Sequence, residues 1–164
     1  MQGRDALITY LEDTEAAERN FEDALAAFAK QGEQESVKST MQWMSEKAKT
    51  QHERLERRLR DLGGSPSTAK SALAHMLAFT PTSAQIGHSP GEKDTQHLMI
   101  TYAAAAAEMA MYEALASVAE VAGDQETVRL ARQLQSEERQ DYDKAWELLK
   151  PSALESFRKL TSAA

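Results

Sequence analysis

The chain of 164 residues has no cysteine, and it has only 4 prolines and 7 glycines. The absence of cysteine excludes disulfide bonds and thiolate metal sites. A metal site would therefore use carboxylate and imidazole ligands, which suit iron, manganese or zinc better than copper. The scarcity of glycine and proline, in a chain rich in alanine, glutamate, leucine, glutamine and lysine, favours helical structure.

Positive charge and long apolar runs are also scarce. The formal net charge of -7 at pH 7 argues against binding to nucleic acid, because a phosphate backbone requires a positive protein surface. The basic stretch at residues 54–60 is interleaved with acidic residues, which is typical of a solvated helix face. No segment resembles a signal peptide and none is long enough to span a membrane, so we expect a cytoplasmic protein.

The sequence also lacks a phosphate-binding glycine loop and a nucleophile motif. Enzymes of those classes are therefore not expected. Whether the protein is an enzyme at all depends on the acidic residues described below.

Apolar residues recur every three or four positions in four long segments, which predicts four amphipathic helices. We expect these helices at about 5–30, 35–62, 95–122 and 125–149, with glycines ending the first three. Pro151 is expected to break the chain, and a last short helix should follow over residues 152–160. Short links between the first two and the last two helices make each pair an antiparallel hairpin.

A long connection over residues 63–94 separates the two hairpins, and it should contain a short helix over 68–79. Long connections are uncommon in a compact domain and need a structural reason. In ferritin-like bundles, one long connection crosses over between two helical hairpins. The sequence therefore predicts a single domain over residues 1–164. Its fold class is all-α, a ferritin-like antiparallel four-helix bundle with the crossover between the second and third helices.

Carboxylates interrupt the apolar stripes of three helices near mid-length, at Glu18, Glu108 and Glu138. Counting back from each turn places them at one level of the bundle, with Asp141 close to Glu138. A buried carboxylate is costly unless it is paired, hydrogen-bonded or bound to a metal. Acidic side chains that converge from several helices are typical of ferritin-like metal sites. We therefore predict that the side chains of Glu18, Glu108 and Glu138 approach one another.

The ligand pattern differs from that of a complete di-iron site, which takes Glu from two helices and Glu-x-x-His from the other two. Asp141 stands where a histidine would follow Glu138. In the second helix, the residue three positions before His52 is Lys49, where the Glu-x-x-His pattern requires a glutamate. The candidate ligands are Glu18, Glu108, Glu138, Asp141 and His52, and iron or manganese is the expected ion.

Each candidate also has an interpretation without metal. Arg or Tyr side chains across the core could satisfy Glu18, and tyrosines of its own helix could satisfy Glu108. Glu138 and Asp141 could lie at the rim of the bundle, and His52 could be a half-exposed helix residue. These alternatives stay open at the level of the sequence.

Short segments in all four expected helices carry a family resemblance. They are residues 13–25, residues 51–56, residues 108–112 with the helix stop at 123–124, and residues 134–138 with the pattern Leu-x-x-Glu-Glu. These segments resemble the YciE/YciF family of ferritin-like proteins. The resemblance implies a homodimeric four-helix bundle associated with bacterial stress responses. It also implies a di-metal centre whose ligands would include Glu18, Glu108 and Glu138.

The chain departs from the family pattern at two places. Ala105 and Ala106 stand where the family's third helix often has Glu-His, and Met44 and Ala48 stand where its second helix often has inward histidine and threonine. The resemblance therefore implies a reduced or incomplete metal site. Two alternatives remain: a metal-free helical scaffold or protein-interaction module, and a di-iron oxidase-like or iron-binding protein.

Overall fold

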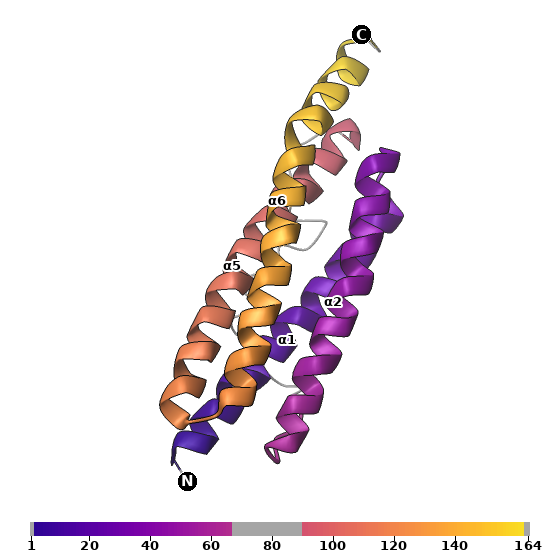
Figure 1. The fold of residues 1–164 in the computed structure, drawn as a ribbon. Coiled ribbons are helices and arrows are strands. Elements are labelled where there is room, and N and C mark those ends of the chain that lie inside the picture. Colours follow the sequence, from indigo (N-terminus) through magenta and orange to yellow (C-terminus); the bar gives the residue numbers. More distant parts are fainter. Residues whose placement is uncertain (1, 67–89, 163–164) are drawn as a thin grey trace.

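The computed structural model describes residues 2–66 and 90–162, and every regular element in them is a helix (Figure 1). The helices are α1 (Gln2–Gln31), α2 (Glu35–Asp61), the short 3-10 helix η1 (Pro90–Glu92), α5 (Lys93–Ala122) and α6 (Gln125–Ser162). The predicted all-α four-helix bundle is confirmed. The short helix expected over residues 68–79 lies outside the described residues.

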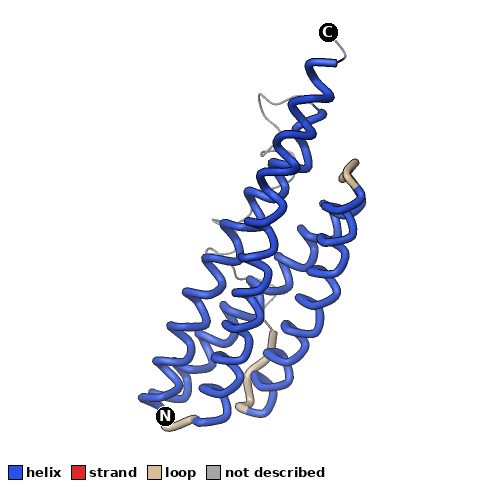
Figure 2. The backbone as a smooth tube through the Cα atoms, turned by 45° about the horizontal axis from the view of Figure 1, so that its top comes forward, coloured by secondary structure: helices blue, strands red, loops and turns tan. Residues whose placement is uncertain are grey.

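The four long helices form two antiparallel hairpins, α1–α2 and α5–α6, that pack side by side (Figures 1 and 2). Gly123 ends α5 in the left-handed region at φ 74°, which a residue without Cβ adopts at little cost. The next residue, Asp124, then caps α6 because its Oδ1 accepts a hydrogen bond from the backbone N–H of Thr127 at 3.1 Å.

Asp94 in the first turn of α5 ties the second hairpin to the first. Its Oδ2 accepts hydrogen bonds from the backbone N–H groups of Glu33 at 2.9 Å and Gln34 at 2.6 Å. These groups lie in the link just before α2, at its N-cap Gln34 and the residue before it, where backbone N–H groups have no partner within the helix. A carboxylate from α5 therefore caps the N-terminus of α2.

The C-terminal end differs from the expectation. The predicted break at Pro151 and separate helix over 152–160 are not found, because α6 is continuous and contains Pro151. Proline removes one backbone hydrogen bond from a helix interior. Contacts beyond it compensate: the side-chain N–H of Gln34 donates to the Ser152 carbonyl and to Ser156 Oγ, each at 3.3 Å. Tertiary contacts therefore hold the last turns of α6 in line.

Two apolar clusters fill the bundle, one toward each end, and the carboxylate level lies between them. The first cluster includes Leu7, Leu11, Leu55, Leu59, Leu115 and Leu134. The second includes Leu25, Phe28, Met41, Met44, Leu98 and Ala145. Burial of each large apolar side chain contributes about 1.5–3 kcal/mol. The two clusters thus fix the rotation of all four helices and force the residues between them into the interior.

Candidate metal centre

The side chains of Glu18, Glu108 and Glu138 converge at the middle of the bundle. One carboxylate oxygen from each lies within 4.8 Å of the others. Their exposed fractions are 0%, 3% and 0%. They come from α1, α5 and α6, so three of the four helices supply a carboxylate. The predicted approach of these three side chains is confirmed.

The fourth helix, α2, supplies a neutral amide at the same level. The Nε2 of Gln51 donates a hydrogen bond to Glu138 Oε1 at 2.9 Å. Gln51 is fully buried, while its neighbour His52 is only partly buried. The sequence stripe of α2 ran through both positions and did not distinguish them. The structure places Gln51 in the core.

In the part of the chain that the structure describes, one oxygen of each carboxylate has no hydrogen-bond partner. Tyr112 donates its hydroxyl proton to Glu18 Oε1, and a hydrogen bond joins Glu108 to Glu138. Within residues 2–66 and 90–162, the Oε2 atoms of Glu18, Glu108 and Glu138 accept no hydrogen bond. Buried polar atoms are normally satisfied. One unsatisfied oxygen on each of three converging side chains is therefore a feature that needs an explanation.

The electrostatics of the site favour protonated carboxyl groups when no cation is present. Burial, followed by the charge of Glu138, raises the pKa of Glu18 well above its usual range. Burial, with the charge of Glu18 next, does the same to the pKa of Glu108. Burial raises the pKa of Glu138 from 4.5 to about 7. Low dielectric and like charges both penalise the ionised forms, so the cluster holds protons unless positive charge replaces them.

Tyr112 stays a proton donor in this setting. Burial raises the pKa of its hydroxyl, and the nearby carboxylates raise it further. The sequence suggested Tyr102 or Tyr112 as a partner for Glu108, but Tyr112 bonds Glu18 and Tyr102 contacts Tyr142 instead. The partner of Tyr112 depends on side-chain reach across the core, which the sequence pattern does not contain.

Asp141 lies one turn beyond Glu138 and is paired with a lysine that the sequence interpretation missed. Its Oδ1 is 2.5 Å from Lys47 Nζ, which also donates to the Glu137 carbonyl at 2.6 Å. Burial raises the pKa of Asp141 to about 6, although Lys47 opposes that rise. Glu138 and Asp141 are both 0% exposed, so the alternative that they lie at the rim of the bundle is wrong.

His52 is not among the converging residues. It lies between α2 and α1, partly buried, with its Nδ1 2.7 Å from Glu22 Oε2. The structure therefore separates the five candidates into a converging set of three glutamates, a neighbouring lysine–aspartate pair and a histidine on the α1–α2 face.

The donor set fits one hard divalent cation better than two. Carboxylate oxygens suit magnesium, manganese and ferrous iron. A di-iron site would require two histidines, but the described residues bring no imidazole to the triad, and α2 offers Gln51 in place of a carboxylate. The residues present therefore fit a reduced site that could hold a single ion.

No described helix is long and apolar enough to cross a membrane.

Among curated proteins, no sequence matches this chain. Solved structures do match. A protein of Xanthomonas campestris pv. campestris is 25% identical, with a TM-score of 0.81 and coverage of 98% of this chain and 99% of its own. The Escherichia coli stress protein YciF is 21% identical, with a TM-score of 0.81 and coverage of 92% and 96%.

A third similar structure is YcfI from Rhodopseudomonas palustris, at 23% identity and a TM-score of 0.78, covering 88% of this chain and 93% of its own. Residues 2–157 match the family described as a domain of unknown function, DUF892. This match covers nearly all of the chain and agrees with the resemblance of its helices to YciE/YciF proteins. The chain therefore belongs to the DUF892 family, with YciF as one of its structural relatives.

Proposed function

We propose that this bundle binds one divalent metal ion, iron or manganese, through Glu18, Glu108 and Glu138. The observation that carries the proposal is the set of three buried Oε2 atoms without partners, in side chains that converge from three helices. A cation at this point would satisfy all three oxygens. It would also remove the repulsion that holds protons in the cluster.

The surrounding side chains would position the ligands. Tyr112 and Gln51 each bond one oxygen of a carboxylate, which leaves the second oxygen of Glu18 and Glu138 free for the ion. Outer hydrogen bonds of this kind orient metal ligands and tune their basicity. A bound iron or manganese ion would supply Lewis-acid or redox chemistry, and the chain would bind it and exclude bulk water.

Metal content tests this proposal directly. Elemental analysis of protein grown with iron or manganese should find about one ion per chain in the wild type, as one three-carboxylate site predicts. Glu108→Gln keeps the side-chain volume but removes the charge, and should bind much less metal. Glu120→Gln is the matched control, because Glu120 lies on the same helix with its side chain 53% exposed. It should retain the wild-type metal content.

The alternative is a metal-free scaffold or interaction module. It is favoured by the partners already present: Tyr112 on Glu18, Gln51 on Glu138 and Lys47 on Asp141. In that case the triad would stay protonated in the cell. Equal and negligible metal in the wild type and in Glu108→Gln would exclude the metal proposal, and the metal-free scaffold would be the remaining interpretation. The proposal includes no catalytic step.

We further propose that the protein works as a cytoplasmic homodimer in a stress response. The stress role rests on the printed description of its relative YciF as a stress protein. The dimer is supported by a partly exposed aromatic cluster on α5 and α6, where Tyr102 lies 4.1 Å from Tyr142 and 5.4 Å from Trp146 between ring centroids. Trp146 is 61% exposed, and aromatic residues of this kind are enriched in protein interfaces.

Light scattering after size-exclusion chromatography tests the dimer. Trp146→Glu should shift the protein to a monomer if the aromatic cluster forms the interface. Trp43→Glu is a suitable control because Trp43 is 45% exposed but lies on α2. A wild-type protein that is monomeric at all concentrations would exclude the homodimer.

A further inference from the structure

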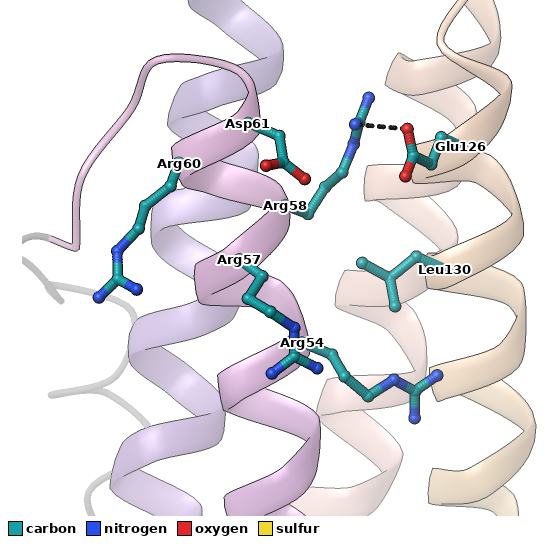
Figure 3. A pocket seen from close by; sticks show the side chains of 7 residues that line it. All are labelled: Arg54, Arg57, Arg58, Arg60, Asp61, Glu126 and Leu130. Atoms are coloured by element: carbon teal, nitrogen blue, oxygen red, sulfur yellow. Dashed lines mark hydrogen bonds and ion pairs between the residues drawn. The ribbon is translucent and has the colours of Figure 1, made fainter.

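A pocket between α2 and α6 gathers arginine side chains on a protein whose net charge is -7 (Figure 3). Its lining includes Arg54, Arg57 and Arg58 from α2 and Leu130 from α6. The sequence alone suggested that these arginines form a solvated helix face. The structure shows that these arginine side chains differ in their hydrogen-bond partners, and the difference indicates which of them could contact a ligand.

Arg58 is hydrogen-bonded to residues at the start of α6. Its Nε donates to Thr127 Oγ1 at 2.9 Å, its Nη1 to Glu126 Oε2 at 2.7 Å, and its Nη2 to Asp124 Oδ2 at 2.6 Å. This guanidinium therefore ties the C-terminal end of α2 to the start of α6. It forms one end of the pocket, and each of its three nitrogens already donates a hydrogen bond to a residue at the start of α6 or to the cap of that helix.

Arg54 and Arg57 have unused donors. Arg54 is held by Glu137, whose two carboxylate oxygens accept from the single nitrogen Nη1 at 2.9 and 3.0 Å. Its Nε and Nη2 make no hydrogen bond within the described residues. Arg57 makes no hydrogen bond or ion pair at all within residues 2–66 and 90–162. The two residues are three positions apart on α2, so their side chains are neighbours on one helix face.

The fourth arginine provides a natural comparison. Arg60 also lines the pocket, but Figure 3 shows its guanidinium turned to the other side of α2, away from Arg54 and Arg57. It is paired with Glu56 on its own helix. Arg60 therefore carries the same charge on the same segment, but at the edge of the pocket farthest from Leu130.

We propose that this pocket binds a compact phosphate-bearing small molecule, with Arg57 and Arg54 as the residues that contact the phosphate. Guanidinium groups bind phosphate oxygens through paired, charge-assisted hydrogen bonds. Glu137 holds Arg54 in place, so less side-chain freedom is lost on binding. Leu130 offers an apolar surface to the organic part of the ligand.

The acidic neighbours limit the ligand to a compact one. Asp61 and Glu126 also line the pocket, and the whole chain is negatively charged. Both features disfavour an extended polyanion such as nucleic acid. Glu126 lies at the Arg58 end of the pocket in Figure 3, so a single phosphate group bound by Arg54 and Arg57 would stay clear of its carboxylate.

The proposal can be tested by titrating inorganic phosphate into the full-length, nitrogen-15-labelled protein, with sodium chloride keeping the ionic strength constant. The arginine Nε–Hε signals of Arg54 and Arg57 should shift in a saturable way, while that of Arg60 should not. Arg57→Gln should weaken binding about tenfold, which is typical for loss of a charge-assisted hydrogen bond. Arg60→Gln, the matched control, should leave the affinity unchanged.

Equal shifts of all three arginine signals, or equal losses in the two variants, would overturn the proposal, because they would indicate screening of surface charge only. The test is independent of the metal site. Glu108→Gln should leave phosphate binding unchanged, and Arg57→Gln should leave the metal content unchanged.

Discussion

The buried carboxyl group of Glu138 should make the stability of the metal-free protein depend on pH. Burial raises its folded-state pKa from 4.5 to about 7. Between these values the folded protein binds more protons than the unfolded chain. The stabilisation that comes from protonating Glu138 is therefore complete below about pH 4.5. It is lost as the pH rises to 7. The shift corresponds to a loss of about 3 kcal/mol.

Glu138→Gln isolates this effect, because glutamine has nearly the same shape and does not titrate. At about pH 5 the wild-type side chain is protonated, and the two proteins should have similar free energies of unfolding. At about pH 8 the wild type must bury a charge, so the variant should be more stable by about 3 kcal/mol. Chemical denaturation in the presence of a chelator at both pH values measures the difference.

The comparison of variant with wild type cancels the titration of groups that do not interact with Glu138. Glu147→Gln is the control, because Glu147 is an exposed glutamate on the same helix. It should show no pH-dependent difference. If Glu138→Gln changes stability by the same amount at both pH values, the side chain does not titrate as its burial implies, and the reasoning is refuted.

Two further perturbations test neighbouring parts of the core. His97 is 0% exposed, and burial lowers its pKa to about 4, so the wild type should lose stability as pH falls from 6.5 to 4. His97→Phe should abolish about 3 kcal/mol of that loss in denaturation at these two pH values; an unchanged acid sensitivity would contradict this. Lys47→Met leaves Asp141 buried and unpaired, and should cost about 3–5 kcal/mol at pH 8. The cost should shrink at pH 5, where Asp141 with its pKa of about 6 is protonated; an equal cost at both pH values would argue against the ion pair.

The convergence of the three glutamates was predictable because it depends only on periodicity. A residue on the apolar stripe of a helix must face the core when strong apolar clusters lie on both sides of it. Counting from the two turns then sets the level. Glu18, Glu108 and Glu138 satisfied both conditions, and the structure brings them together.

Other features of the site depend on contacts that a helical pattern does not specify. Gln51 and His52 are about 100° apart around α2, and a stripe that runs between them allows either to face inward. The structure buries Gln51 against Glu138 and leaves His52 beside Glu22. The choice is made by the packing of α2 against both α1 and α6.

The expected helix break at Pro151 was wrong for the same reason: tertiary contacts that a local sequence pattern does not specify. The rule that proline ends a helix is local, and its cost of about 3 kcal/mol can be offset by tertiary contacts. Ser152 and Ser156 are each 2% exposed and lie against Gln34. A nine-residue segment that looks weakly amphipathic in isolation is thus held in α6 by two buried serines that carry no apolar signal.

At the proposed site, a metal ion would have to compete with protons for the unsatisfied carboxylate oxygens. Glu18 and Glu108 both have raised pKa values, and no lysine or arginine contacts the triad within the described residues. Among the described residues, the ammonium group that lowers the pKa values of Glu18 and Glu138 belongs to Lys47, and it is paired with Asp141. Positive charge must therefore come from protons or from a cation. Because a cation must displace protons, its affinity falls as pH falls. If the proposed site binds a cation, the metal-free and metal-bound bundles would be two states of the same three carboxylates, and pH and metal supply would together decide between them.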